Sequence, residues 1–377
     1  MISVPTNLMT TGKRKARVAV IGTGWWGTTA HLPALAAHPD AEIVAVCDQR
    51  ADVLARVADK FQIETTYTDY LQMLRREELD GVVVSVWSAA HFEVARACLA
   101  RQLHILVEKP MVLRAPHAKE LVDLSRLHQR ELIVGYPWHY SQRARQAREI
   151  LQTGELGQIR YINCYFASTV IDFFRGDDKA YGKLFPYAVV GPGNVYSDRE
   201  RSGGGQGHLQ VTHAAALMHF ITGLRPVQVM ALMDNLDVSV DVIDAITVRM
   251  DNGALASVGS TGNLQVSDPG KLTIQVNCEH GWLDFDFITG AGKVRRANGS
   301  DEYFSVLDSE EPPVGCEQSE VLFPLRAPAN NLVDVITGQR PNESTGEVGW
   351  RTVELLDAAY RSASLNGQRV SVESLYR

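Results

Sequence analysis

Cysteine is scarce in this sequence, and its cysteines are not arranged in pairs. The five are Cys47, Cys98, Cys164, Cys278 and Cys316. Because no two of them stand in CxxC spacing, we expect neither a disulfide framework nor a structural zinc site, and we expect a reducing cytoplasmic location. The first twelve residues are polar and lack the apolar core of a signal peptide, which favours the same location.

Long hydrophobic runs, excess positive charge and hydrolase motifs are also missing. The longest apolar stretches, such as 82–86, are far too short to span a membrane. The formal net charge is −7, so the chain is poorly suited to binding nucleic acid through phosphate neutralisation. No HExxH, no other cluster with metal-ligand spacing and no GxSxG is present, which argues against a metal site and a serine hydrolase.

The first third of the sequence has the pattern of an α/β domain. A chain of 377 residues exceeds the usual size of one hydrophobic core, so we expect two domains. Short apolar runs alternate with helical segments up to about residue 140, which predicts a doubly wound parallel sheet of the Rossmann type over 1–140. The predicted strands are 17–21, 43–47, 82–86, 104–107 and 132–135, and the predicted helices are 26–37, 51–61, 69–76 and 91–100.

The remainder, 141–377, changes in character and predicts an α+β domain with a mostly antiparallel sheet. Asp251-Asn252-Gly253 is a strong hairpin signal between two of its strands. Segment 168–207 has no clear period, and a loop of that length is usually functional. The predicted strands are 159–166, 227–233, 242–250, 254–260 and 271–277, and the predicted helices are 143–151, 212–222 and 346–365.

A glycine fingerprint follows the first predicted strand and opens a helix. It reads Gly22-Thr23-Gly24-Trp25-Trp26-Gly27. In a dinucleotide site the first glycine permits the turn, the second admits the pyrophosphate, and the third lets helix and strand pack closely. The helix N-terminus then faces the phosphates. The alternative is an ordinary glycine-rich turn, with the two tryptophans packing between domains rather than covering a dinucleotide.

Asp48 ends the second predicted strand, followed by Gln49 and Arg50. A carboxylate at this place accepts the hydroxyls of the adenosine ribose and repels a 2′-phosphate, which favours NAD over NADP. Arg50 leaves NADP as an alternative cofactor, because a nearby arginine can accommodate the 2′-phosphate. Asp48 could equally serve as the N-cap of the helix that begins at residue 51.

Glu108-Lys109-Pro110 follows the fourth predicted strand. The carboxyl ends of parallel strands are where open α/β sheets bind ligands. A lysine at this edge could polarise a substrate oxygen or relay a proton, although an isolated lysine is more often a surface residue.

With these motifs the chain resembles the Gfo/Idh/MocA family, the glucose-fructose oxidoreductase and inositol dehydrogenase group. The resemblance rests on the glycine fingerprint with 31–35 behind it, on 108–110, on Gly154-Glu155-Leu156-Gly157, and on the glycines 203–205 that lead to His213. It implies a Rossmann domain, a C-terminal open sheet, and a homo-oligomer (dimer or tetramer). It also implies hydride transfer between NAD or NADP and a secondary alcohol of a sugar, sugar derivative or cyclitol, and a cis bond before Pro110.

The resemblance assigns catalysis to Lys109 and His213, with one departure. The family pattern has an Asp four residues before the histidine, where this chain has Leu209. Loss of that carboxylate should lower the pKa of His213. A neutral imidazole still accepts a proton, so His213 remains the expected base and Lys109 the residue that polarises the oxygen. Without the resemblance, His213 would be interpreted as a packed helix histidine.

Further candidates are assigned from their positions after predicted strands or in the aperiodic loop. We expect some of them beside the nicotinamide and the others around the substrate. The cofactor neighbours are Ser85, Trp87, His91 and Glu108, and the substrate neighbours are Tyr136, His139, Asp172, Tyr196, His208 and Gln210.

Two other functions remain open. One is glycoside cleavage through a redox cycle on a retained NAD, which some relatives of this family perform. The other is a non-catalytic NAD-binding sugar sensor, which the missing Asp at position 209 would suit.

Overall fold

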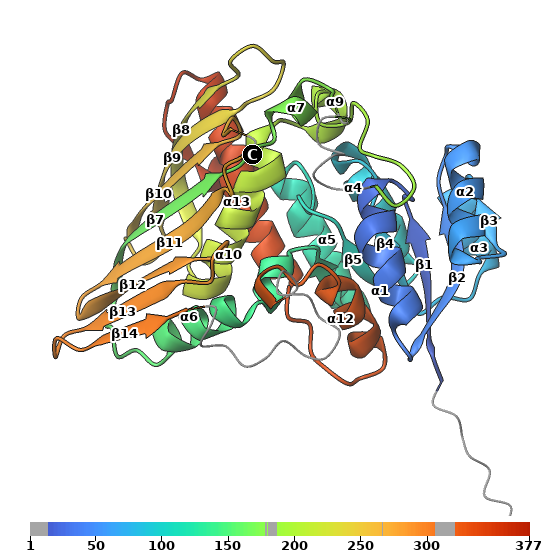
Figure 1. Cartoon of the computed structure of the whole chain (residues 1–377), viewed down its shortest axis with the longest axis horizontal. Coiled ribbons are helices and arrows are strands. Elements are labelled where there is room, and N and C mark those ends of the chain that lie inside the picture. The colour runs from blue at the N-terminus through green and yellow to red at the C-terminus, as the bar shows by residue number, and fades with distance from the viewer. Residues whose placement is uncertain (1–13, 178, 180–186, 266, 306–320) are drawn as a thin grey trace, which may run out of the picture.

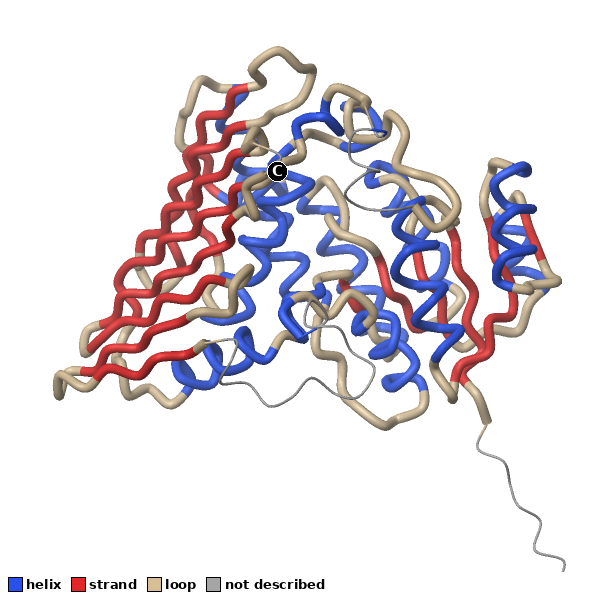
Figure 2. The backbone as a smooth tube through the Cα atoms, viewed as in Figure 1, coloured by secondary structure: helices blue, strands red, loops and turns tan. Residues whose placement is uncertain are grey.

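The computed structural model describes residues 14–177, 179, 187–265, 267–305 and 321–377. Two β-sheets lie on opposite sides of the molecule, and most of the helices fill the space between them or cover the first sheet (Figures 1 and 2). No helix within these ranges has the length and apolar composition needed to cross a bilayer.

The first sheet has six parallel strands in the order β3-β2-β1-β4-β5-β6. This is the strand order of a doubly wound dinucleotide fold, so the predicted Rossmann domain is confirmed. Runs such as Gly81–Val84 are buried on both faces because helices cover both sides of the sheet. The strands are β1 Ala16–Ile21, β2 Ala41–Cys47, β3 Thr66–Tyr67, β4 Gly81–Val84, β5 His104–Val107 and β6 Leu132–Val134.

The helices of this half begin close to the predicted residues, except for α5, which was not predicted. A π-helical turn, Gly27–His31, leads into α1, and Asp69 caps α3 by accepting the N–H of Leu71 at 2.8 Å. Asp48 does not cap α2: the N-cap residue is Arg50, without a side-chain cap bond, so that alternative is wrong. The helices are α1 Leu32–Ala37, α2 Ala51–Phe61, α3 Tyr70–Arg76, α4 His91–Ala100, α5 Ala115–His128 and α6 Gln142–Gln152.

The second sheet has nine strands in the order β14-β13-β12-β11-β7-β10-β9-β8-β15. Only the β7–β10 pair is parallel, which confirms an open, mostly antiparallel sheet. Asp251-Asn252-Gly253 joins β9 to β10 as predicted. The strands are β7 Ile159–Ala167, β8 Pro226–Asp234, β9 Ile243–Met250, β10 Leu255–Thr261, β11 Lys271–Cys278, β12 Gly281–Asp286, β13 Gly292–Arg296, β14 Asp301–Phe304 and β15 Val370–Ser371.

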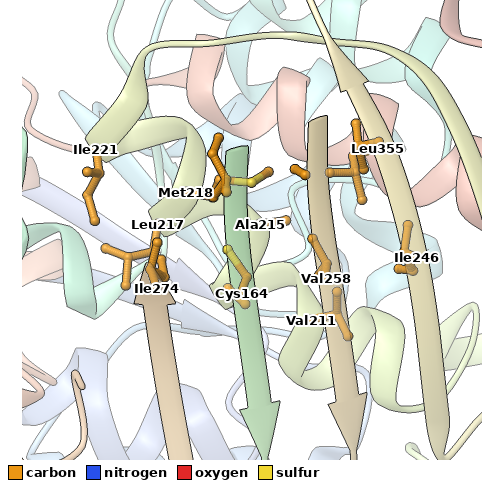
Figure 3. Packing of buried hydrophobic residues seen from close by; sticks show 14 of the residues in the cluster. Cys164, Val211, Ala215, Leu217, Met218, Ile221, Ile246, Val258, Ile274 and Leu355 are labelled. Carbon is orange, nitrogen blue, oxygen red and sulfur yellow. The ribbon is translucent and has the colours of Figure 1, made fainter. Parts of the chain in front are cut away.

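Helices α10 (Thr212–Thr222) and α13 (Gly346–Ser364) cover the inner face of this second sheet. Figure 3 shows α10 residues such as Met218 against Cys164, Val258 and Ile274 of neighbouring strands. In β9, buried and exposed residues alternate strictly, because one face of the sheet packs on these helices. The alternation therefore determines which face of the sheet meets these helices.

Helix α12 (Ala327–Ile336) belongs to the segment after the predicted boundary at residue 140 but packs against the first domain. Its Ala329, Leu332 and Val333 are completely buried against the core of the first sheet. The strands thus divide between 1–140 and 141–377, but helices of the later segment, α12 and α13 with residues such as Val353, complete the cores around the first sheet. Among its described residues, the aperiodic segment contains the short helices α7 (Ile171–Phe174) and α9 (Arg199–Ser202).

Candidate active site

A cavity of about 980 Å³ lies between the two halves of the molecule. On one side it is lined by residues that directly follow β1, β2, β4 and β5, the carboxyl edge of the first sheet. On the other side it is lined by the end of β7, segment 191–204 and the first turn before α10. The fold therefore brings the predicted ligand-binding edge of the sheet against the aperiodic loop.

The glycine loop has the geometry of a phosphate cradle. Gly22 has a φ of +92°, and a Cβ there would lie 2.3 Å from the Ser85 carbonyl oxygen. A Cβ on Gly27 would lie 2.5 Å from the Gly22 oxygen, so both positions require glycine. Around Gly24, only an Arg50 nitrogen comes within 4 Å of the corresponding point, at 3.7 Å. The backbone at Gly24 is thus open to the cavity, as a bound pyrophosphate needs.

Asp48 lies at the cavity edge at the end of β2 and is nearly buried. One carboxylate oxygen accepts the Thr23 N–H at 2.9 Å, and Arg50 donates to both oxygens at 2.9 and 3.0 Å. Burial opposes ionisation of Asp48, but the bonds from Arg50 and Thr23 outweigh burial and lower its pKa. A fixed negative charge therefore stands where the ribose hydroxyls of NAD would bind.

The Glu108 carboxylate connects the segment after the glycine loop to the end of β5. Its Oε1 lies 2.8 Å from Nε2 of His31, and its Oε2 accepts the Lys109 N–H at 3.0 Å. A Cβ on Gly135 would come within 2.5 Å of the same carboxylate. Glu108 lines the cavity, but these contacts show that it also joins the first helix to the ends of β5 and β6.

Lys109 projects from the end of β5 toward the second domain, and its peptide bond to Pro110 is cis. Its Nζ donates to the backbone carbonyl of Leu209 at 3.1 Å. Burial lowers the pKa of Lys109 to about 8, against the opposing charge of Glu108. Position 209 thus contacts the lysine through an uncharged backbone oxygen, and its side chain supplies no carboxylate.

His213 lines the same cavity from the first turn of α10. Its ring lies edge-on to Trp138, with centroids 5.0 Å apart, and to Tyr136 at 5.8 Å. Its Nδ1 is buried with no hydrogen-bond partner among the described residues. Burial, with the nearby charge of Lys109, lowers the pKa of His213 well below its ordinary value. The imidazole is therefore neutral at physiological pH.

A π-helical turn, Gly207–Val211, precedes α10 and presents His208 and Gln210 to the cavity. Asp241 holds this turn: its carboxylate accepts the N–H groups of Gly205 at 2.8 Å and Gly207 at 2.6 Å. Burial lowers the pKa of His208 to about 4, although Asp241 opposes the shift. π-turns of this kind often occur at functional sites.

The structure brings most predicted site residues to this cavity. Trp87 and His91 lie on the loop after β4, and His91 joins that loop to the next by its bond with the Pro110 carbonyl oxygen at 2.8 Å. Tyr196 reaches the cavity from the aperiodic segment. The predicted residues that line it are Gly22, Gly24, Trp25, Trp26, Asp48, Gln49, Arg50, Ser85, Trp87, His91, Glu108, Lys109, Tyr196, His208, Gln210 and His213.

Three predicted substrate neighbours lie elsewhere. Tyr136 is buried behind His213, and its hydroxyl pairs with that of Thr212 at 2.9 Å. The ring of His139 is enclosed between Ser344 and Phe220. Asp172 lies on α7 and pairs with Arg175 at 3.6 Å, outside the cavity. Tyr136 and His139 follow a strand end but turn into the interior, where distant residues such as Ser344 enclose them, and Asp172 faces away on a short helix. Proximity in sequence to a strand end therefore does not place each side chain in the cleft.

Thr23 and Gly27 belong to the fingerprint but do not line the cavity. Thr23 is completely buried, and both its N–H and its hydroxyl donate to Asp48. Gly27 packs on Gly22. Both residues shape the loop rather than facing a ligand.

Apolar and aromatic side chains of the substrate half were not predicted. Their sequence context carries no motif, because a residue that faces a cavity and one that faces the core look alike in periodicity. These residues are Phe166, Val170, Phe173, Val195, Phe287 and Phe323, together with the polar Ser168, Thr169 and Asp268.

Comparison with known proteins agrees with this geometry. Residues 16–136 match the model of the Gfo/Idh/MocA oxidoreductase family with an NAD-binding Rossmann fold, and residues 144–284 match a C-terminal domain model of the same family. An uncharacterised oxidoreductase from Synechocystis is 28% identical over 321 residues, which is 82% of this chain and 79% of that protein. An inositol 2-dehydrogenase from Salmonella paratyphi B is 28% identical over 162 residues, 42% of this chain and 48% of the relative.

Among solved structures, a levoglucosan dehydrogenase in complex with NADH and levoglucosan has the same fold. The TM-score is 0.76 at 18% identity, and the match covers 95% of this chain and all of the other.

Proposed function

The chain belongs to the Gfo/Idh/MocA family of NAD-binding oxidoreductases, and on this premise we propose that it oxidises a secondary alcohol of a sugar, sugar derivative or cyclitol, reversibly. The observation that carries the proposal is the placement of Lys109 and His213 in the same cavity as the glycine loop and Asp48. NAD, when bound, supplies the hydride acceptor for the carbinol carbon. The residues around the cavity then have to orient the alcohol and accept its proton.

The surroundings of the two residues favour Lys109 as the proton acceptor, which exchanges the roles expected from the sequence. The Lys109 ammonium has an acceptor in the Leu209 carbonyl and a nearby carboxylate in Glu108. The His213 cation would have a buried Nδ1–H with no partner, so His213 is a poor base. In the proposed reaction the neutral Lys109 amine takes the hydroxyl proton, the hydride leaves the carbon, and neutral His213 orients the hydroxyl.

Asp48 and the glycine loop would hold the cofactor. The carboxylate, with its lowered pKa, suits ribose hydroxyls and disfavours a 2′-phosphate, so we propose NAD as the preferred cofactor. Arg50 is bonded to Asp48 and is not free to bind a phosphate without breaking that pair.

We also propose that the protein is a cytoplasmic homo-oligomer. Cys47, Cys98, Cys164 and Cys278 are free thiols, which suits a reducing compartment. The outer face of the second sheet exposes large apolar side chains on neighbouring strands, and exposed apolar patches mark association surfaces. A second copy is the proposed partner, through Tyr161, Tyr165, Met230, Leu232 and Leu255.

The test is a substrate screen with the purified protein. Sugars, glycosides and cyclitols are offered with NAD and with NADP separately, and formation of the reduced cofactor is followed by absorbance. The Lys109→Ala variant should bind NAD as the wild type does and lose nearly all turnover, by a factor of about 10² to 10⁴. Undiminished turnover in that variant would refute the assignment.

A further inference from the structure

A segment of the second domain crosses the cofactor side of the cavity. Residues 187–196 precede α9, and Gly191, Pro192, Val195 and Tyr196 line the cavity together with the glycine loop and residues 48–50. In Figure 1 the yellow-green chain before α9 extends over the first domain toward α2. The cavity is therefore covered at the end where the adenosine half of a dinucleotide would lie.

Helix α2 holds this segment from the first domain. The Arg56 side chain donates to the Val189 carbonyl at 2.6 Å, and the Lys60 ammonium donates to the Ala188 carbonyl at 2.7 Å. Arg56 and Lys60 are four residues apart, so they project from one face of α2. The helix begins directly after residues 48–50, so the element that carries these two anchors starts at the adenosine end of the cavity.

Apolar contacts reinforce the two hydrogen bonds. Val189 and Val190 pack against the apolar core that β1 and α2 share. Tyr187 packs edge-on against Trp25 of the glycine loop, with ring centroids 5.7 Å apart. The start of the segment is thus attached to the first domain by both polar and apolar groups.

The far end is attached as well. Arg201 of α9 lies over the ring of Trp87, 5.6 Å from its centroid, on the loop that follows β4. Tyr196 packs against Phe173, and Phe173 against Trp25, each at 5.5 Å between centroids. The residues of the segment that line the cavity lie between these two attachments: Gly191, Pro192, Val195 and Tyr196.

We infer that residues 187–196 act as a cofactor clamp: NAD bound along the glycine loop leaves only after the segment has detached from α2. The inference rests on the proposed NAD site. It adds Arg56, Lys60, Val189 and Val190 as determinants of how long the cofactor stays bound, although none of them lines the cavity. A slowly released cofactor would favour turnover in which the same NAD is reduced and reoxidised in place by a second carbonyl substrate.

Stopped-flow fluorescence of the full-length protein with NADH tests the clamp, with excess NAD added as the displacing ligand. The first variant, Arg56→Ala with Lys60→Ala, removes the polar anchors. The second, Val189→Ser with Val190→Ser, weakens the apolar contact without changing charge. We expect NADH to dissociate about tenfold faster from each, equivalent to about 1.4 kcal/mol. The control is Arg75→Ala with Arg101→Ala, which removes two positive charges from exposed positions away from the segment.

The outcomes separate the clamp from its alternatives. Faster dissociation from both variants, with the control unchanged, supports it. An effect confined to the Arg56/Lys60 variant, seen as slower association that depends on salt, means that the two cations only attract the cofactor and overturns the clamp. Unchanged dissociation from both variants also overturns it. If wild-type protein does not bind NADH, the cofactor assignment fails first and the clamp fails with it.

Discussion

Introducing the carboxylate that position 209 lacks would test whether Lys109 is the proton acceptor. Leu209 is nearly buried among apolar residues that include Val170, Phe174 and Val242, and its own carbonyl accepts the Lys109 Nζ. In Leu209→Asp the new carboxylate would lie close to Lys109, whose Nζ donates to the backbone carbonyl of the same residue. An opposite charge within about 4–6 Å stabilises the charged form of a group and shifts its pKa by about 1–3 units. The pKa of Lys109 should therefore rise from about 8 to at least about 9.

The consequence for the rate follows from the fraction of neutral amine. At pH 7 a group with a pKa of about 8 is neutral in roughly a tenth of the molecules, and each further unit reduces that fraction about tenfold. Alcohol oxidation by wild-type protein should thus increase with pH and level off above about 8. In Leu209→Asp the plateau should move upward by a unit or more, and kcat/KM at pH 7 should fall at least about tenfold.

The assay is kcat/KM for alcohol oxidation from pH 6 to 10, with a substrate found in the screen and saturating NAD. Leu209→Asn is the matched control, because it has the same size and also buries a polar group but adds no charge. It should lose stability as the Asp variant does while keeping the wild-type pH profile. Identical profiles for the two variants would show that the rate does not depend on ionisation of Lys109, and a wild-type rate that falls above pH 8 would show that Lys109 acts as a cation. Either result would refute the proposed roles.

Three further predictions follow from single contacts. Asp48→Ser should raise the KM for NAD about 10- to 100-fold and reduce the preference for NAD over NADP, because a hydrogen bond from a ribose hydroxyl to a charged acceptor is worth about 1.5–3 kcal/mol. Initial rates with each cofactor measure this effect, and an unchanged ratio of kcat/KM for NAD to kcat/KM for NADP would contradict the prediction. Glu108→Ala should reduce the free energy of unfolding by about 3 kcal/mol, since it leaves His31 buried without its partner, and denaturant titration at pH 7 checks it. Leu232→Asp should shift the molar mass measured by light scattering toward the monomer, whereas Leu127→Asp, an exposed site on α5, should not.

The sequence predicted those parts of the fold in which local pattern and burial coincide. The five longest strands of the first sheet are apolar runs, followed in turn by Gly22, Asp48, Ser85, Glu108 and Gly135, so their existence and their carboxyl ends could be predicted. β3 has only two residues, and β13 and β14 carry mixed charges on an exposed edge, so they have no periodic signal. α12 could not be assigned to the first core, because the partner of an amphipathic helix is decided by tertiary packing.

Residues of the candidate site could be predicted where the chemistry requires a particular residue type. They could not be predicted where a side chain only shapes the wall of the cavity. The glycines and Asp48 could be named because few residues serve a phosphate turn or a ribose, and Lys109 could be named because Glu108-Lys109-Pro110 resembles a family motif. Tyr136 and His139 have suitable chemistry but face the interior, and Phe166 and Phe323 line the cavity without any motif. The direction of a side chain near a strand end depends on contacts from elements far away in sequence, such as Ser344 on His139.

Leu209 contacts Lys109 through its backbone and not through its side chain. The π-turn Gly207–Val211 adds a residue to the helical turn and directs the Leu209 carbonyl at Lys109, so the lysine is oriented by a backbone oxygen. This contact carries no negative charge. A lysine oriented by a carboxylate would stay protonated near neutral pH, whereas one oriented by a carbonyl in a buried cavity can lose its proton there. A substitution that appears in the sequence as the loss of an acid–base partner therefore leaves a stronger case for Lys109 as the base.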